Sequence, residues 1–372
     1  MTFNSLVTLG LKIIIGIVVL VLVFVIGVIV YAYVGKRKYE KVTDTNDLKA
    51  RIAKLAEPYM AKRTNGALVI GVLQNGKEHV QGFGGSSPPD RSTVYEIGSV
   101  TKVFTALTLA KLSADGLIKL DEPVRKCFPN SVNIPTNITF RHLATHSSGL
   151  PRLPDNFFAV VGSSANPYIR YTKEHLYKYF ETAKKLRDPG KPSGYSNLGF
   201  GLLGHALELC AGKPYATLVR EHVFVPLGMD NTGVTNANVI PGHDPKGKPT
   251  PNWDFDVMAP AGVFRSNAED MLKFLRANLE PDRTPIAAAL RECKKPNGRD
   301  CGLGWQIKGT FEGLAIVWHN GGTAGYRSFV GFDPQNNTAV VLLSNYGDAF
   351  ANDDSIDKMG IEILKLASKI SL

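Results

Sequence analysis

Ser99 and Lys102 lie three residues apart, and their side chains are of the types that a nucleophile and its base require. Positions i and i+3 share one face of a helix, so the Lys102 amine can reach the Ser99 hydroxyl. A serine hydroxyl is a weak nucleophile until a base takes its proton, and burial near other cations favours the neutral lysine that can do so. The Ser99 amide can also donate to a developing oxyanion. The pair therefore has the residue types and the spacing of a serine nucleophile and its base.

The S-x-x-K spacing also occurs by chance, and a helix-capping serine followed by a surface lysine gives the same letters. The residues after Lys102, 103–109, are mostly apolar, which predicts a helix that buries this lysine in part. No G-x-S-x-G motif occurs in the chain, which disfavours the nucleophile elbow of α/β-hydrolases.

A second motif, Tyr195-Ser196-Asn197, follows a Pro/Gly-rich segment at 189–194 and precedes an expected helix. A tyrosine near cations can act as a phenolate base and then as an acid. Asn197 can donate to a substrate carbonyl and accept from Lys102. A packed tyrosine followed by an asparagine helix cap is the structural alternative.

A third motif, His319-Asn320-Gly321-Gly322, ends an expected strand at 314–318. Glycine lets a substrate backbone approach the strand edge, and the Gly322 amide could be a second oxyanion donor. An ordinary glycine turn after a strand is the alternative.

Together the three motifs resemble the class C-like branch of the serine β-lactamase and penicillin-binding-protein superfamily, in family order and with family-like separations. The resemblance extends over about 45–370, and three further stretches are similar to family segments: 143–151, 260–266 and 325–328. It implies an α/β (α+β) fold of the β-lactamase/transpeptidase type, with an antiparallel sheet, flanking terminal helices and a helical lobe.

The resemblance also implies roles for the motif residues. Ser99 would attack the carbonyl, and Lys102 and Tyr195 would share the proton transfers. The amides of Ser99 and Gly322 would form the oxyanion hole. The substrate-binding and oxyanion-hole residues would be Asn197, His319, Gly321 and Gly322. No metal and no cofactor are required. His142 and His146 have metal-ligand spacing on a helix, but their stretch matches a structural segment of the family.

His319 stands where most β-lactamases of the superfamily have a lysine that helps to hold a substrate carboxylate. A largely neutral histidine does this less well, which lowers the rank of β-lactamase activity. We therefore expect a D-Ala-D-Ala-type peptidase or a carboxylesterase first and a β-lactamase third. A catalytically silent ligand-binding protein is the alternative. We expect Arg327 to be a surface arginine, with a substrate carboxylate contact as the alternative.

Alternation and turn signals predict the elements that position these motifs. Asn75-Gly76 joins two expected strands, 67–73 and 78–84, in a hairpin. Further strands are expected at 303–308, 314–319, 326–332 and 338–344. Helices are expected at 44–62, 99–114, 172–184, 198–211, 215–222, 267–279 and 353–370. Strands from both ends would form one antiparallel sheet, so an α/β lobe would comprise about 42–120 and 285–372. A helical lobe would comprise about 121–284, with the catalytic cleft between the lobes.

Residues 1–41 are expected to form a membrane anchor and its basic flank. The stretch 13–35 holds no charged residue and as a helix would span about 34 Å, enough for the hydrocarbon core of a bilayer. Its last residues, 31–35, make a poor signal-peptide cleavage site. The domain at 42–372 would then belong to a single-pass membrane protein.

Two signals conflict on the side of the membrane. The basic cluster at 36–41 favours a cytoplasmic domain by the positive-inside rule. Cys293 and Cys301 flank a Pro-Asn-Gly turn that could join them in a disulfide, which would imply an oxidising compartment; two free thiols are the alternative. With the family resemblance, we expect an extracytoplasmic domain.

The composition narrows the class of protein and its partners. Of 372 residues, 44% are hydrophobic and 20% are charged, which excludes a disordered or collagen-like chain. The formal net charge is +10, but no run of like charge is long enough for a nucleic-acid-binding stripe. We expect a small-molecule or peptide substrate, no nucleic acid, and the membrane as the partner of the N-terminal helix.

Overall fold

The computed structural model describes residues 47–183, 187–191, 194–235, 238–298, 300–311, 314–347 and 355–372. By their contacts the residues divide into two units, 1–55 and 56–372, and helix α2 (Leu48–Met60) runs from the first into the second. The expected membrane anchor at 13–35 lies outside the described residues. Within those residues, no helix combines the length and the apolar character needed to cross a bilayer.

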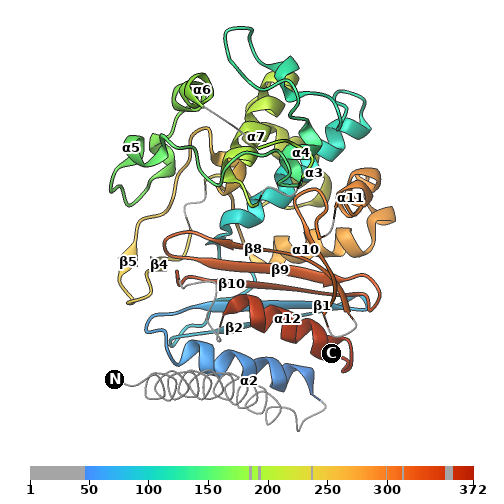
Figure 1. Cartoon of the computed structure of the whole chain (residues 1–372). Coiled ribbons are helices and arrows are strands. Elements are labelled where there is room, and N and C mark those ends of the chain that lie inside the picture. The colour runs from blue at the N-terminus through green and yellow to red at the C-terminus, as the bar shows by residue number, and fades with distance from the viewer. Residues whose placement is uncertain are drawn as a thin grey trace, which may run out of the picture. The chain divides into compact units, whose positions relative to one another are not determined.

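A six-stranded antiparallel sheet is the framework of the second unit (Figure 1), and it confirms the predicted sheet. The strand order is β2-β1-β10-β9-β8-β7, so the N-terminal hairpin joins the C-terminal meander through β1 and β10. The strands are β1 (Leu68–Gln74), β2 (Lys77–Phe83), β7 (Gln306–Phe311), β8 (Leu314–Gly322), β9 (Arg327–Asp333) and β10 (Thr338–Ser344). Asn75 and Gly76 both have positive φ, as the tight hairpin turn requires.

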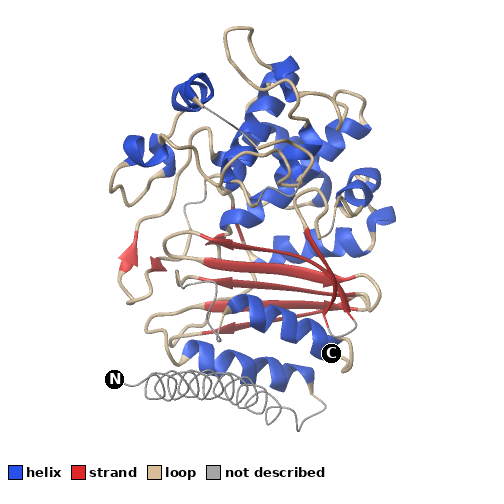
Figure 2. Ribbon diagram, viewed as in Figure 1, coloured by secondary structure: helices blue, strands red, loops and turns tan. Residues whose placement is uncertain are grey.

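Helices cover both faces of this sheet (Figure 2). Helix α10 (Ala268–Leu279) packs on β1, β9 and β10, and its Leu272 lies against the face that Gly71 and Val341 share. Helix α12 (Ile356–Ala367) packs on β9 and β10 against the opposite face. The two central strands β1 and β10 are therefore buried along their whole length, and their residues are apolar apart from Gln74, Thr338 and Ser344 at the strand ends.

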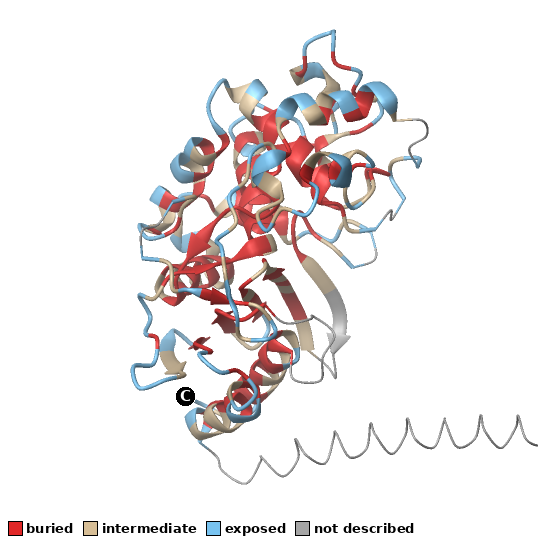
Figure 3. Ribbon diagram, turned by 90° about the vertical axis from the view of Figure 1, so that its left-hand side faces the viewer, coloured by how far each residue is buried: buried red, intermediate tan, exposed pale blue. Residues whose placement is uncertain are grey.

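Helix α3 (Thr101–Ala114) is buried on nearly all sides. Figure 3 shows that buried residues lie on the sheet and on the helices beside it. Its Phe104 ring packs on the rings of Phe224, Phe264 and Phe274. The other α-helices are α4 (Phe140–Ala144), α5 (Phe157–Val161), α6 (Lys173–Thr182), α7 (Asn197–Ala211), α8 (Tyr215–Val219), α9 (Val225–Leu227) and α11 (Ala287–Cys293). The short helical turns are η1 (Gly98–Val100), η2 (Val124–Cys127), η3 (Tyr168–Arg170), η4 (Arg220–Phe224), η5 (Ala259–Ala261) and η6 (Pro281–Arg283).

Four two-residue strands also form, which sequence alternation cannot predict at that length. They pair as β3 (Tyr95–Glu96) with β6 (Arg265–Ser266) and as β4 (Gly242–His243) with β5 (Pro249–Thr250).

The disulfide predicted between Cys293 and Cys301 is wrong. Cys293 is buried in the core at the end of α11, whereas the Cys301 thiol donates to the Asn297 carbonyl oxygen, so the two sulfurs are not joined. The structure instead joins Cys127 in η2 to Cys210 near the end of α7, with their Cα atoms 5.2 Å apart. These two cysteines are 83 residues apart, and no local turn signal pairs them.

Candidate active site

The predicted nucleophile Ser99 lies in η1, immediately before α3, and two glycines bring this turn against the end of β8. Gly98 has a φ of +48°, and a Cβ built on it would lie 2.6 Å from the nitrogen of Gly322. A Cβ on Gly321 would lie 2.0 Å from the carbonyl oxygen of Ile97. The two predicted oxyanion donors, the amides of Ser99 and Gly322, therefore belong to backbone segments in direct contact.

Lys102 is fully buried in the first turn of α3. Its Nζ lies 3.0 Å from the Oγ of Ser99 and 2.6 Å from the carbonyl oxygen of Ala261. Burial, followed by the positive charge of Arg152, lowers the pKa of Lys102 well below its ordinary value of 10.5. The structure thus places an amine that favours its neutral form within reach of the predicted nucleophile.

Tyr195 lies beside this pair. The Nζ of Lys102 is 4.7 Å from the centre of the Tyr195 ring. Burial raises the pKa of the Tyr195 phenol above its ordinary value, and a hydrogen bond with Ser99 and the charge of Arg152 lower that pKa to a smaller extent. The structure therefore favours a protonated phenol over the phenolate that nearby cations suggested, because burial outweighs their charge.

His146 holds Tyr195 from the other side, a role that the sequence did not indicate. The two rings lie 4.5 Å apart, and the Nδ1 of His146 accepts a hydrogen bond of 3.0 Å from the backbone nitrogen of Ser196. His142 instead accepts from the backbone nitrogen of Thr139. The two histidines thus serve different local contacts, and no group of three metal-ligating side chains occurs among the described residues.

His319 is buried near the end of β8, and its ring centre is 6.3 Å from that of Tyr195. Its Nδ1 donates to the carbonyl oxygen of Asn320 over 2.6 Å. Burial, and then the charge of Lys102, lower the pKa of His319 to about 3. His319 is therefore neutral above pH 5, and it does not supply the positive charge of a lysine at this position.

Asn197 begins α7 and lines the pocket. Its Nδ2 donates to the hydroxyl of Tyr168 over 3.2 Å, and its Oδ1 is buried without a hydrogen-bond partner among the described residues. The expected hydrogen bond from Lys102 to Asn197 is not formed, because the lysine donates to Ala261. The free carbonyl oxygen of the Asn197 amide is left for a substrate N–H group.

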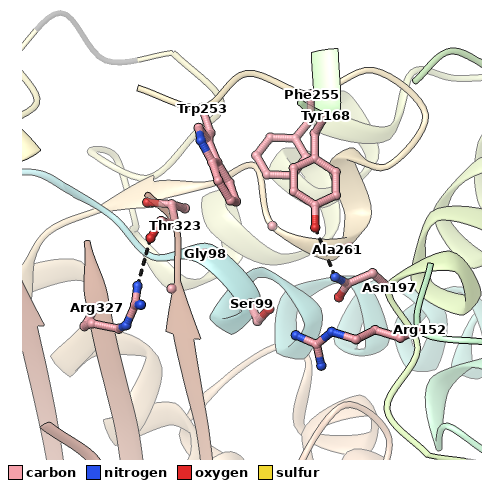
Figure 4. Close-up of a pocket in the computed structure, with 12 residues that line it drawn as sticks. Gly98, Ser99, Arg152, Tyr168, Asn197, Trp253, Phe255, Ala261, Thr323 and Arg327 are labelled. Carbon is pink, nitrogen blue, oxygen red and sulfur yellow. Dashed lines mark hydrogen bonds between the residues drawn. The ribbon is translucent and has the colours of Figure 1, made fainter. Parts of the chain in front are cut away.

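A pocket opens at Ser99, and Figure 4 shows the side chains that line it. Residues of η1, η5 and the end of β8 line it. Three aromatic side chains and two arginines also line it: Tyr168, Trp253, Phe255, Arg152 and Arg327. No aspartate or glutamate is among the described lining residues.

Arg327 is not the surface arginine that the sequence suggested. It is partly buried at the start of β9 and lines the pocket. Its Nη1 donates to the carbonyl oxygens of Thr323 and Tyr326, at 2.8 and 2.7 Å. These bonds tie the arginine to the turn between β8 and β9.

The fold and the site define a serine hydrolase of the β-lactamase/transpeptidase type. A family model described as Beta-lactamase matches residues 52–358, and the chain belongs to this family. It is therefore a β-lactamase-related serine hydrolase.

Individual relatives agree with this assignment. The chain is 31% identical over 321 residues to the D-alanyl-D-alanine-carboxypeptidase/endopeptidase AmpH of Escherichia coli strain K12, over 77% of this chain and 80% of that protein. It is 24% identical to a β-lactamase of Pseudomonas fluorescens, over 80% of this chain and 94% of that protein. The crystal structure of a β-lactamase/D-alanine carboxypeptidase from Pseudomonas syringae has the same fold. That structure has a TM-score of 0.74 and 22% identity, over 86% of this chain and 98% of the other.

Proposed function

We propose that this protein is a serine peptidase that cleaves D-Ala-D-Ala-type peptides through an acyl-Ser99 intermediate. The observation that carries the proposal is the 3.0 Å separation between the Ser99 Oγ and the Nζ of a fully buried lysine, Lys102. A buried amine with a lowered pKa is the base that a serine nucleophile needs.

In the first step the Ser99 Oγ attacks the scissile carbonyl carbon while its proton passes to the neutral Lys102 amine. The carbonyl oxygen becomes an oxyanion, which the amides of Ser99 and Gly322 stabilise. Preorganised amides of this kind stabilise the transition state because they do not have to reorient as the charge develops.

In the second step the tetrahedral intermediate collapses and the C–N bond breaks. The leaving nitrogen takes the proton of the Tyr195 phenol, and the Lys102 ammonium restores that proton to Tyr195. Water then attacks the acyl-serine and gives up a proton to the neutral Lys102 amine, and the Ser99 oxygen takes that proton from Lys102 as it leaves. The products are the shortened peptide acid and the free amine, and the site returns to its starting protonation.

The substrate class is supported by the relative AmpH, which is named a D-alanyl-D-alanine carboxypeptidase and endopeptidase. A carboxylesterase is the second candidate, since the same steps cleave an ester and the neutral His319 supplies no charge for a terminal carboxylate. A β-lactamase ranks third for the same reason, although relatives carry that name.

The test is release of D-alanine from a peptide ending in D-Ala-D-Ala, alongside hydrolysis of a simple aryl ester, by the full chain purified in detergent. The proposal predicts both activities in the unaltered protein and neither in Ser99→Ala. Ester hydrolysis without D-alanine release would favour the carboxylesterase. Folded protein that turns over neither substrate would favour a silent ligand-binding protein.

We also propose that the stretch 13–35 anchors the protein and that its catalytic domain lies outside the cytoplasm. A disulfide such as Cys127–Cys210 persists in oxidising compartments and is rare in the cytosol. The disulfide therefore supports a catalytic domain outside the cytoplasm. A cysteine introduced at the exposed position 86 (Ser86→Cys) should react with a membrane-impermeant thiol reagent in intact cells. Reaction only after lysis would contradict this orientation.

A further inference from the structure

Arg152 is fixed to the catalytic motifs by its backbone. Its carbonyl oxygen accepts hydrogen bonds from the nitrogens of Asn197 and Leu198, at 3.0 and 3.3 Å, in the first turn of α7. Its guanidinium carbon lies 5.1 Å from the centre of the Tyr195 ring. The side chain thus starts from an anchored point and extends along the pocket beside Ser99 and Asn197 (Figure 4).

The guanidinium of Arg152 has no carboxylate or carbonyl partner among the described residues, although the side chain is exposed in the pocket. The other arginines of this region are engaged. Arg327 donates to two carbonyl oxygens, and Arg265 lies 2.9 Å from Asp254 and 3.8 Å from the buried Glu96. Arg152 therefore keeps its five N–H donors available to a ligand.

The charges around Arg152 favour an anion. Lys102 and His319 prefer their neutral forms, so neither competes with the guanidinium for a negative group. No acidic side chain lines the pocket in the described part of the chain. A guanidinium presents parallel N–H groups that match both oxygens of a carboxylate, which makes a carboxylate the fitting partner.

The pocket wall that faces the Arg152 guanidinium is formed by aromatic rings. The Tyr168 and Phe255 rings stack with their centres 4.7 Å apart, and the Trp253 ring lies 5.2 Å from Tyr168. The Trp253 indole nitrogen is already bonded to the carbonyl oxygen of Ala165 over 2.9 Å, so this side chain offers the pocket mainly its ring. A ligand that fits both features combines an anionic group with an apolar portion.

We propose that Arg152 binds a carboxylate of the substrate and thereby makes the site selective for anionic amides or esters. This inference rests on the proposed acyl-Ser99 chemistry and adds the charge of the substrate to it. The carboxylate could belong to the acyl portion or to the leaving portion, and the same guanidinium chemistry serves both.

The test compares kcat/KM for two matched pairs of esters. In the first pair, the 4-nitrophenyl ester of butyrate and the mono-4-nitrophenyl ester of glutarate differ by a carboxylate on the acyl side. In the second pair, phenyl acetate and 3-carboxyphenyl acetate differ by a carboxylate on the leaving side. The variants are Arg152→Gln and Arg152→Lys, with Arg220→Gln as the control, since Arg220 is exposed and outside the pocket.

The proposal predicts that the anionic-to-neutral ratio of kcat/KM falls about tenfold or more in Arg152→Gln for one of the two pairs, as expected for loss of a charge-assisted hydrogen bond. The pair affected identifies the side that carries the carboxylate. Arg152→Lys should recover part of the ratio, and Arg220→Gln should keep it. The ratio cancels any general effect of Arg152 on Lys102 or Tyr195.

Ratios unchanged in both pairs would overturn the role of Arg152 while Ser99→Ala still abolished hydrolysis. Hydrolysis that survives in Ser99→Ala would overturn the proposed function instead. If the esters are turned over too slowly, the rate at which a fluorophosphonate labels Ser99 can be measured with and without a competing ligand. N-acetyl-D-alanine should then protect the unaltered protein better than its amide does. Equal protection by the two would contradict the proposal.

Discussion

The backbone nitrogen of Gly322 lies only 2.6 Å from the position that a Cβ on Gly98 would occupy. This close approach joins the turn before Ser99 to the end of β8, and it exists because Gly98 carries no side chain and has a φ of +48°. The spacing of the proposed oxyanion hole therefore depends on a residue that takes no part in the chemistry.

Gly98→Ala should separate these two segments and lower kcat/KM by about 100-fold or more, as loss of an oxyanion donor does. The control is Gly116→Ala, since Gly116 has a φ of +80° but no atom within 4 Å of its Cβ position. Both variants carry the backbone strain of about 1 kcal/mol, but only Gly98→Ala should lose activity. Equal activity in the two variants would contradict the proposed hole.

Lys102→Met should remove the base and yet stabilise the fold. The rate of acylation should fall by about 10²–10⁴, the usual contribution of a general base. The thermal midpoint should rise, because a buried amine is replaced by an apolar side chain of similar length. Calorimetry and acylation rates measure the two effects. A variant that is both inactive and less stable would show that Lys102 is mainly structural.

The pH dependence of stability provides a further check on Lys102. Its pKa is lowered in the folded state, so below pH 10.5 the unfolded chain binds more protons than the folded chain does. The free energy of unfolding should therefore rise with pH toward 10.5, and this rise should be smaller in Lys102→Met. Parallel curves for the two proteins, from urea unfolding at several pH values, would contradict a buried neutral lysine.

His319 should make the protein sensitive to acid. Because its pKa is about 3 when folded and 6.5 ordinarily, the unfolded state gains the proton first, and stability is lost as the pH falls from 6.5 to 3. His319→Gln should reduce that loss, whereas His79→Gln, at a partly exposed position on the edge strand β2, should not. Urea unfolding between pH 7 and 4 measures the difference, and identical curves would refute it.

Cys127→Ser should cost about 2–4 kcal/mol of stability, because the bridge to Cys210 closes a long loop in the unfolded chain. A reducing agent should destabilise the unaltered protein by a similar amount and leave the variant unchanged. Cys301→Ser, at a free thiol, should keep the response to reductant. If Cys301→Ser removed that response, the pairing of the cysteines would have to be reassigned.

Short-range patterns predicted much of the fold. The Asn75-Gly76 turn predicted the first hairpin, and apolar alternation predicted the strands of the C-terminal meander. Both signals could be used because a turn and an alternating strand are determined by residues that are close together in the sequence. The sequence patterns placed the ends of some elements differently from the structure. β8 runs on to Gly322, since its pairing with β9 continues through the glycines that look like a turn in the sequence.

Long-range contacts could not be predicted in the same way. Cys127 meets Cys210 only because η2 and α7 pack together. Arg152 lies about a hundred residues before Trp253 and Phe255 of the aromatic wall, and no spacing rule connects them. The burial that keeps Tyr195 protonated is likewise a property of the folded site, whereas the sequence shows only its cationic neighbours.

The role of Ser99 as nucleophile is tested most directly by the intact mass of the full chain during exposure to a penicillin, compared with Ser99→Ala. We expect a covalent adduct of one penicillin mass in the unaltered protein and none in the variant. Persistence of the adduct would indicate a slow, penicillin-binding type of acyl-enzyme, and its loss with consumption of the antibiotic would indicate β-lactamase turnover. The same adduct on Ser99→Ala would contradict the central claim that Ser99 is the nucleophile.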